Sequence, residues 1–263
     1  MSSTVCLGLL LAVQFSVTTA QGEWRPTYSE PASVHLTHPR VVILTHSSLH
    51  FDPFRETEPG INQSVAAVKA HGGAVIFLHD RYNPSNSPEG ILCRDRTAGQ
   101  LVASDVGNID FNFRNVRHVC LCGGYFGQCE RSTACDAIRL WRRDCPDEDF
   151  RLTQVVDGIF TVAEHVSPED PYGSKILRHY FDTMKPRHAR AAMSLDRLLR
   201  MIDDPAMEAD YVCRQALDFP AGVHVQLDYF GTTRTLQSAG PNASTLTVEF
   251  RRSTDLLAND LRP

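Results

Sequence analysis

Short apolar runs that alternate with stretches of helical periodicity constrain this chain more than any other feature of its sequence. Four runs are apolar on both faces, as strands buried inside a parallel sheet are, and they cover 41–45, 74–78, 116–121 and 150–156. Apolar residues at helical spacing lie at 60–71, from residue 129 onward, at 172–184 and at 195–202, with a short segment at 188–193. The alternation predicts an α/β fold with a doubly wound, mostly parallel sheet in three α/β/α layers, in the Rossmann-like manner.

The two ends of the chain have a different pattern. Residues 21–38 are polar and rich in proline, which predicts an extended N-terminal arm ahead of an α/β domain at 39–203. In residues 204–263, Val223 to Tyr229 and Leu246 to Phe250 alternate apolar and polar positions, with a Gly-Pro-Asn stretch between them. This pattern predicts a small C-terminal β-containing extension, built as a long hairpin or as two added strands.

The first twenty residues have the character of a secretory leader. Residues 5–15 are apolar but too few to span a bilayer, and small residues follow at 18–20. We expect residues 1–20 to be a cleaved signal peptide and the mature protein to be secreted or extracytoplasmic; a short anchor is the alternative. Later apolar stretches are too short for a membrane helix, so no membrane association is expected after cleavage.

Composition excludes several classes of protein. A chain of 263 residues that is 42% hydrophobic is too apolar for a disordered protein and long enough to bury a substantial core. Its formal charge of -5 gives no basic surface, so nucleic acid is not expected as a partner.

The cysteines give a weaker signal. Loss of the leader removes Cys6 and leaves an odd number, at positions 93, 120, 122, 129, 135, 145 and 213. At least one thiol therefore stays unpaired within a monomer. Cys120 and Cys122 are two apart on an expected strand, so they share a face, but no second pair follows at zinc spacing. We expect them to be buried as small apolar residues.

A glycine-rich turn leads from the strand at 116–121 into the helix that begins at Cys129. Such a turn lifts the first helical side chain clear of the sheet, and the helix N-terminus offers backbone N–H groups that favour thiolate and could bind an oxyanion. Gly124, Gly127 and Gln128 are the turn residues expected to form that oxyanion site. The alternative is a structural cysteine at a helix cap.

The segment Cys129-Glu130-Arg131-Ser132-Thr133-Ala134-Cys135-Asp136-Ala137 resembles the C-V-x-x-T-A-R-D-A signature of the isochorismatase-like cysteine hydrolases, which include the nicotinamidases. The preceding strand and the strand that ends at Asp157 also occupy the places they have in that family. The resemblance covers residues 40 to 202. It implies hydrolysis of small amides, esters or vinyl ethers by a set of Asp, Lys and Cys, without a cofactor, in a protein that forms homo-oligomers.

This sequence departs from the family at two of the three catalytic positions. His46 stands where the family has Asp, and Ser48 stands at the amide position that follows. No lysine lies between Lys69 and Lys175; Arg94 and Arg96 occupy that window, but arginine cannot exchange protons. The family's metal loop is unmatched as well, because Tyr82 and Asn86 replace its histidines after Asp80, so no metal is expected.

Two interpretations remain open. In the first, Cys129 is a nucleophile, His46 takes its proton, and Arg94 or Arg96 binds an anionic part of a small-molecule substrate. Tyr125 and Phe126 then line a pocket for a flat ring, or else pack under the helix. In the second, the protein binds a ligand or partner without catalysis and His46 is a polar residue at a strand end. A nucleotide-phosphate loop is a weaker third candidate, because Gly123-Gly124-x-x-Gly127 lacks the G-x-G-x-x-G order.

Overall fold

The computed structural model describes residues 26–83, 86–104, 109–162, 192–200 and 205–258. The expected signal peptide, the start of the arm and the helix expected at 172–184 lie outside these residues. The described strands are β1 (Arg40–Thr45), β2 (Ala74–His79), β3 (Gln100–Ala103), β4 (His118–Gly123), β5 (Phe150–Val155), β6 (Phe160–Val162), β7 (Ala192–Ser194), β8 (His224–Tyr229), β9 (Thr232–Gln237) and β10 (Thr245–Arg251). The described helices are η1 (Pro31–Ser33), α1 (Glu58–Ala70), η2 (Pro88–Gly90), α2 (Cys129–Asp144), α4 (Leu195–Leu199), α5 (Pro205–Ala216) and α6 (Asp255–Ala258).

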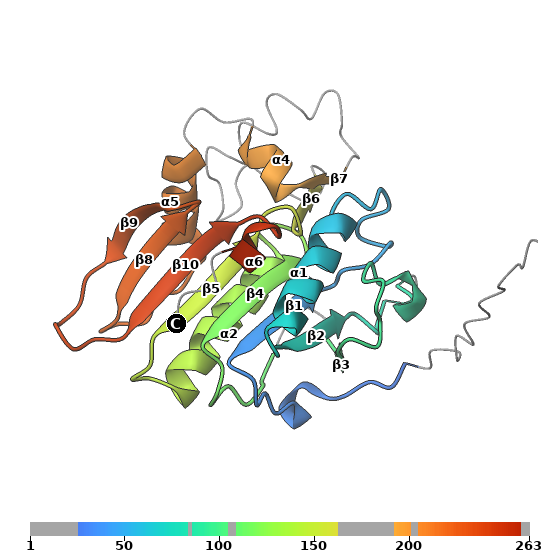
Figure 1. Cartoon of the computed structure of the whole chain (residues 1–263), viewed down its shortest axis with the longest axis horizontal. Helices are drawn as coiled ribbons and strands as arrows, with labels where there is room; N and C mark the ends of the chain where they lie inside the picture. Colours follow the sequence, from blue (N-terminus) through green and yellow to red (C-terminus); the bar gives the residue numbers. More distant parts are fainter. Residues whose placement is uncertain (1–25, 84–85, 105–108, 163–191, 201–204, 259–263) are drawn as a thin grey trace, which may run out of the picture.

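Eight of these strands form one sheet in the order β3-β2-β1-β4-β5-β10-β8-β9 (Figure 1). Every neighbouring pair is parallel except β8 and β9. The predicted α/β class with a mostly parallel sheet is therefore confirmed.

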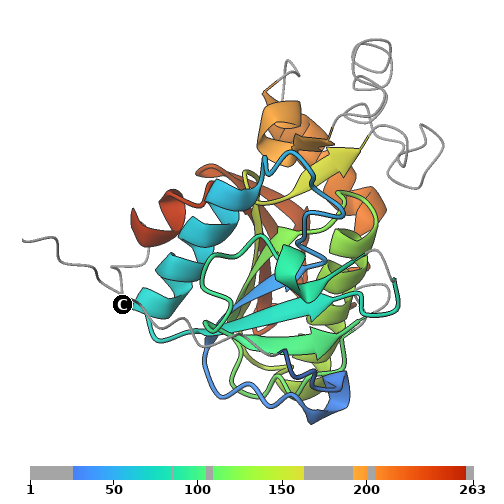
Figure 2. The same ribbon diagram turned by 90° about the vertical axis from the view of Figure 1, so that its right-hand side faces the viewer.

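The central strands are apolar on both faces because helices cover both faces. In β1, Val41 and Ile43 belong to one core cluster, whereas Val42 and Leu44 belong to the other. The first cluster includes side chains of α2 and α5, and the second includes side chains of α1 and α6. Viewed along the sheet, α1 and α2 lie on opposite sides of it (Figure 2).

The C-terminal strands join the main sheet. Strand β10 lies between β5 and β8 and is parallel to both. The two alternating runs therefore do not form a hairpin with each other, and the hairpin alternative is wrong; they are added strands. The hairpin instead joins β8 to β9, where Phe230 and Gly231 have φ values of 48° and 91°, as a tight two-residue turn requires. Strand β9 was not predicted.

Three shorter features differ from what was predicted. Strand β3 lies between the runs expected at 74–78 and 116–121, where no strand was predicted, and pairs with β2 at the edge of the sheet. Beside it, Ser29 of the arm forms a parallel bridge with Val102, and Val34 and Leu36 enter the core. The segment expected at 188–193 contributes β7, which pairs with β6 outside the main sheet.

Candidate active site

The candidate site lies where the strand order reverses. Strands β2 and β3 lie on one side of β1, and β4 and β5 lie on the other. The carboxyl ends of β1 and β4 therefore meet at a switch point of the kind where α/β sheets bind ligands. A Cβ built on Gly123, at the end of β4, would lie 2.5 Å from the carbonyl oxygen of Thr45 and 2.8 Å from Cβ of Ser47. The backbone after β1 therefore runs directly beside the glycine turn.

The turn itself depends on residues without a side chain. Gly123, Gly124 and Gly127 have φ values of 71°, 73° and 87°, in the left-handed region that favours glycine. A Cβ on Gly124 would lie 3.1 Å from the backbone nitrogen of Glu130 and 3.2 Å from Sγ of Cys129. This close approach places the turn against the first residues of α2.

Cys129 is the first residue of α2, as predicted, and is partly exposed. Its Sγ accepts a hydrogen bond from the backbone N–H of Tyr125 at 3.2 Å. The hydroxyl of Thr45 donates to that of Thr133 at 3.1 Å, and Thr133 donates to the carbonyl oxygen of Cys129 at 3.0 Å. These bonds tie the first turn of α2 to the end of β1.

The electrostatic environment of Cys129 differs from the one predicted. Burial raises the pKa of its thiol to about 11, and the charge of Glu130 acts in the same direction. The N–H of Tyr125 lowers the pKa but does not outweigh burial. The expectation of a thiol with a lowered pKa is therefore wrong for the protein without a ligand, and Cys129 is a thiol at neutral pH.

His46 lies at the expected strand end and is 4% exposed. Its φ is 46°, and its backbone N–H donates to the carbonyl oxygen of Leu78 at 2.8 Å. The imidazole stacks on the ring of Phe51, with centroids 5.7 Å apart, and Phe51 meets the edge of Tyr125 at 5.5 Å. Phe51, which was not predicted, thus connects His46 to the loop that holds the sulfur. The hydrogen bond described for the thiol of Cys129 is the one that it accepts from the N–H of Tyr125.

Tyr125 and Phe126, the two aromatic residues considered as the lining of a pocket, lie in different surroundings. Phe126 is 1% exposed and belongs to the core cluster with α2, so its ring packs under the helix and does not line a pocket. Tyr125 is partly buried and contacts Phe51 and Phe160. Of the two residues, only Tyr125 keeps part of its surface exposed.

The two arginines lie on the side of α1. Arg94 is 81% exposed, and its Nε lies 3.6 Å from a carboxylate oxygen of Glu58 in the first turn of α1. Arg96 is close enough to Glu89 to act on its carboxylate electrostatically. The contacts described for Arg94 do not bring it to Cys129, so the substrate-binding role predicted for it lacks support.

The loop after β2 forms a hydrogen-bonded turn in place of the family's metal ligands. A carboxylate oxygen of Asp80 accepts the backbone N–H groups of Tyr82 and Asn83, and the side chain of Asn86 binds Ser48 and the carbonyl oxygen of Asp80. Tyr82 is 63% exposed. Across the described ranges, no group of three or more His, Cys, Asp or Glu side chains could hold a metal ion.

The buried carboxylate of Glu130 was missed. It is the second residue of α2 and is 1% exposed. The sequence did carry a signal, because positions 130, 134, 137 and 141 are spaced along one face of a helix, and the last three are apolar. An acidic residue on a buried helix face beside a candidate nucleophile is unusual enough to indicate a role.

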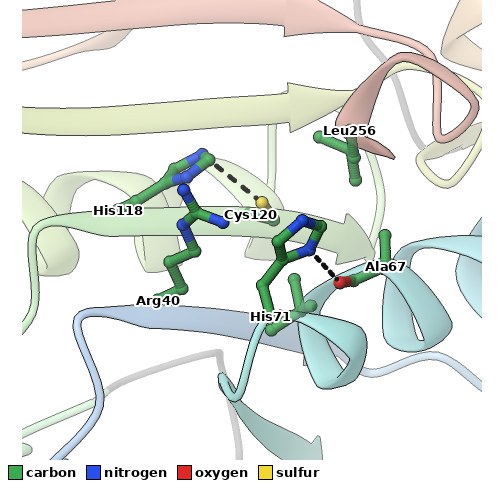
Figure 3. Close-up of a pocket in the computed structure, with 7 residues that line it drawn as sticks. Arg40, Ala67, His71, His118, Cys120 and Leu256 are labelled. Atoms are coloured by element: carbon green, nitrogen blue, oxygen red, sulfur yellow. Dashed lines mark hydrogen bonds between the residues drawn. The ribbon is translucent and has the colours of Figure 1, made fainter. Parts of the chain in front are cut away.

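Of the six other described cysteines, five are buried and Cys135 is partly exposed. In the part of the chain that the structure describes, all seven cysteines are free, and Cys120 and Cys122 are buried against α1 as predicted. Cys120 lines a cavity of about 10 Å³ between α1, α6 and the amino ends of β1 and β4, with His118, Arg40 and His71 around it (Figure 3). That space holds at most one water and lies at the end of the sheet opposite to Cys129.

A larger cleft of about 340 Å³ lies beside the carboxyl ends of β8 and β10. Its residues lie in and just after α4, at the end of β8 and the turn that follows, and from the end of β10 to the start of α6: Asp196, Arg200, Tyr229, Phe230, Arg252 and Asp255. This volume suits a small molecule, although Cys129 is not among its residues.

Neither a scan against protein-family models nor a search of curated proteins finds a match for this chain. In the described residues, no helix combines the length and the apolar character needed to cross a membrane.

Proposed function

We propose that the protein is a divergent isochorismatase-like cysteine hydrolase of small amides, esters or vinyl ethers, with Cys129 as its nucleophile. The observation that carries the proposal is the position of Sγ at the N-terminus of α2, at the switch point of a mostly parallel sheet, with the N–H of Tyr125 pointing at it. The proposal includes the doubly wound, three-layer architecture of that family over residues 39–203.

For an amide or ester, the chemistry needs a base and an oxyanion site. The neutral imidazole of His46 accepts the thiol proton, and Sγ attacks the substrate's carbonyl carbon. The negative charge that forms on the carbonyl oxygen is stabilised by backbone N–H groups of the turn at Gly124, Gly127 and Gln128. The protonated His46 then gives its proton to the leaving amine or alcohol, and water hydrolyses the thioester to release the acid and restore the thiol.

The raised pKa of Cys129 sets a condition for this mechanism. Transfer of the thiol proton to His46 must be coupled to substrate binding, because the free protein holds little thiolate near neutral pH. The ring of Phe51 lies against both His46 and Tyr125, so the proposed proton transfer takes place beside Phe51.

The remaining parts of the proposal concern cell location and partners. The leader-like N-terminus supports secretion after signal cleavage, with no membrane association of the mature protein. The acidic balance supports a small-molecule substrate and argues against nucleic acid. The family resemblance supports a homo-oligomer that works without a cofactor.

A second candidate function is binding without catalysis. Two observations favour it: burial holds Cys129 as a thiol, and the cleft beside β8 and β10 has the volume of a small-molecule site. In that case the protein would bind ligands in the cleft and hydrolyse none of them.

A panel of small amides and esters tests the first function against the second. Hydrolysis by the parent protein should fall at least a thousandfold in Cys129→Ala, because the variant lacks the nucleophile. Cys135→Ala, a matched change at a partly exposed cysteine on the same helix, should keep its activity. Equal rates in the parent and Cys129→Ala would refute catalysis by Cys129, and no turnover by the parent would favour the binding protein.

A further inference from the structure

Glu130 is a buried carboxylate for which the hydrolase mechanism has no use. Among the described residues, neither of its carboxylate oxygens meets the geometry of a hydrogen bond, although the N–H of Gly127 is near enough to lower its pKa. The next residue, Arg131, directs its Nε–H to the carbonyl oxygen of Ala216 at 2.8 Å. An ionised carboxylate in such a place is costly, so a protein that keeps one there gains something from it.

The geometry places Glu130 beside the sulfur. The Cβ position built on Gly124 lies 3.2 Å from Sγ of Cys129 and 3.3 Å from Cβ of Glu130. Because both atoms are that close to a single point, they lie within about 6.5 Å of each other. The carboxylate of Glu130 extends from this Cβ into the same buried surroundings, and its charge raises the pKa of the Cys129 thiol, although less than burial does.

We infer that the charge on Glu130 helps to hold Cys129 as a thiol: the ionised carboxylate disfavours the thiolate, and removal of that charge makes the thiolate easier to form. Glu130 is thus a positioning residue that restrains the nucleophile. This inference rests on the proposed role of Cys129, but it concerns the thiol itself and is measurable without a substrate.

The charges around Glu130 agree with this role. Burial raises its pKa to about 7, opposed by the nearby N–H of Gly127 and the charge of Arg131. The groups that feel its charge are Cys129 and Cys135 on α2 and Cys213 on α5, and the ionised carboxylate raises the pKa of each thiol. Near neutral pH the carboxylate therefore ionises before any of these thiols does.

Alkylation of Cys129 by iodoacetamide, followed by mass spectrometry of the peptide that contains it, tests the inference from pH 5 to pH 10. In Glu130→Gln, which keeps the shape and removes the charge, the rate at pH 8 should rise about tenfold. Glu130→Leu should give the same rise and guards against a buried amide that disturbs the fold. Glu148→Gln removes an exposed carboxylate beyond the other end of α2 and should leave the rate unchanged.

The outcomes separate this inference from the proposed function. A tenfold rise in both Glu130 variants, with no rise in Glu148→Gln, supports control by Glu130 even if no substrate of the panel is hydrolysed. A rate that stays within twofold of the parent in both variants overturns the inference, and it does so even if Cys129 proves to be a catalytic nucleophile.

Discussion

At the scale of single residues, Gly124 meets two separate steric demands. Its φ of 73° disfavours any side chain, and a Cβ there would also press on Sγ of Cys129 and the backbone nitrogen of Glu130. Gly72 meets only the first demand: its φ is 69°, but a Cβ there would have nothing within 4 Å. Comparison of substitutions at the two glycines therefore distinguishes the cost of the positive φ from the cost of steric crowding.

Gly124→Ala is therefore expected to destabilise the protein by about 2–4 kcal/mol, against about 1 kcal/mol for Gly72→Ala. Urea denaturation of both variants measures the difference. Iodoacetamide labelling of Gly124→Ala should also change at Cys129, because the new methyl group displaces the sulfur. Equal losses of stability in the two variants would show that the turn has room for a side chain beside Cys129.

At the scale of elements, a polar row crosses three neighbouring strands on the side of the sheet that α1 and α6 cover. Nε2 of His118 in β4 lies 2.8 Å from the hydroxyl of Thr153 in β5, which donates to a carboxylate oxygen of Glu249 in β10 at 2.7 Å. Since Thr153 donates to Glu249, His118 must be the donor to Thr153. This row links β10, which is distant in sequence, to the centre of the sheet.

The histidine in this row makes stability depend on pH. Burial, together with the charges of Arg151 and Arg40, lowers the pKa of His118 to about 3. The unfolded chain takes up this proton near pH 6.5 and the folded protein only near pH 3, so stability is lost as the pH falls through that window. His118→Gln can still donate to Thr153 but has no imidazole. Between pH 7 and pH 4 it should therefore lose about 1–3 kcal/mol less stability than the parent does.

Chemical denaturation at pH 7 and pH 4 measures this effect. His71→Gln, which removes an imidazole from the wall of the same cavity, is the control for the loss of a ring at this site. If His118→Gln loses as much stability between pH 7 and pH 4 as the parent, the acid sensitivity originates elsewhere.

At the scale of the whole molecule, eight of the described strands form one continuous sheet, and the strands after residue 204 belong to it. Val225, Leu227, Val248 and Phe250 are fully or almost fully buried and share a core cluster with α2. Strand β10 also supplies the pairing edge for β5. The C-terminal region therefore completes the core.

A chain that ends at residue 203 should fail to form the native structure, because it exposes the edge of β5 and the apolar surface that these strands cover. We expect strong binding of a hydrophobic dye and aggregation on gel filtration. A chain that ends at residue 258 keeps every described element and should behave as the parent does. A soluble shorter chain with a cooperative unfolding transition would show that residues 204–263 are a separable extension.

Local pattern predicted the elements that form the middle of the sheet. Strands β1, β2, β4 and β5 and helices α1 and α2 follow from apolar runs and helical spacing, because a strand between two helical layers must be apolar on both faces. The position of Cys129 at the start of α2 follows from the same kind of signal. The edge strands β3 and β9 were not predicted: β3 has only four residues, and β9 is mostly polar and largely exposed, so neither carries a clear apolar pattern.

The sequence by itself determined the class of the fold, the glycine turn and the residue that begins α2, since each depends on neighbours along the chain. Only the tertiary structure decided that β10 lies between β5 and β8, that Phe51 contacts His46 and Tyr125, and that burial keeps Cys129 protonated. These depend on contacts between residues far apart in sequence, and desolvation, which sets the pKa of a thiol, is a property of the assembled surroundings.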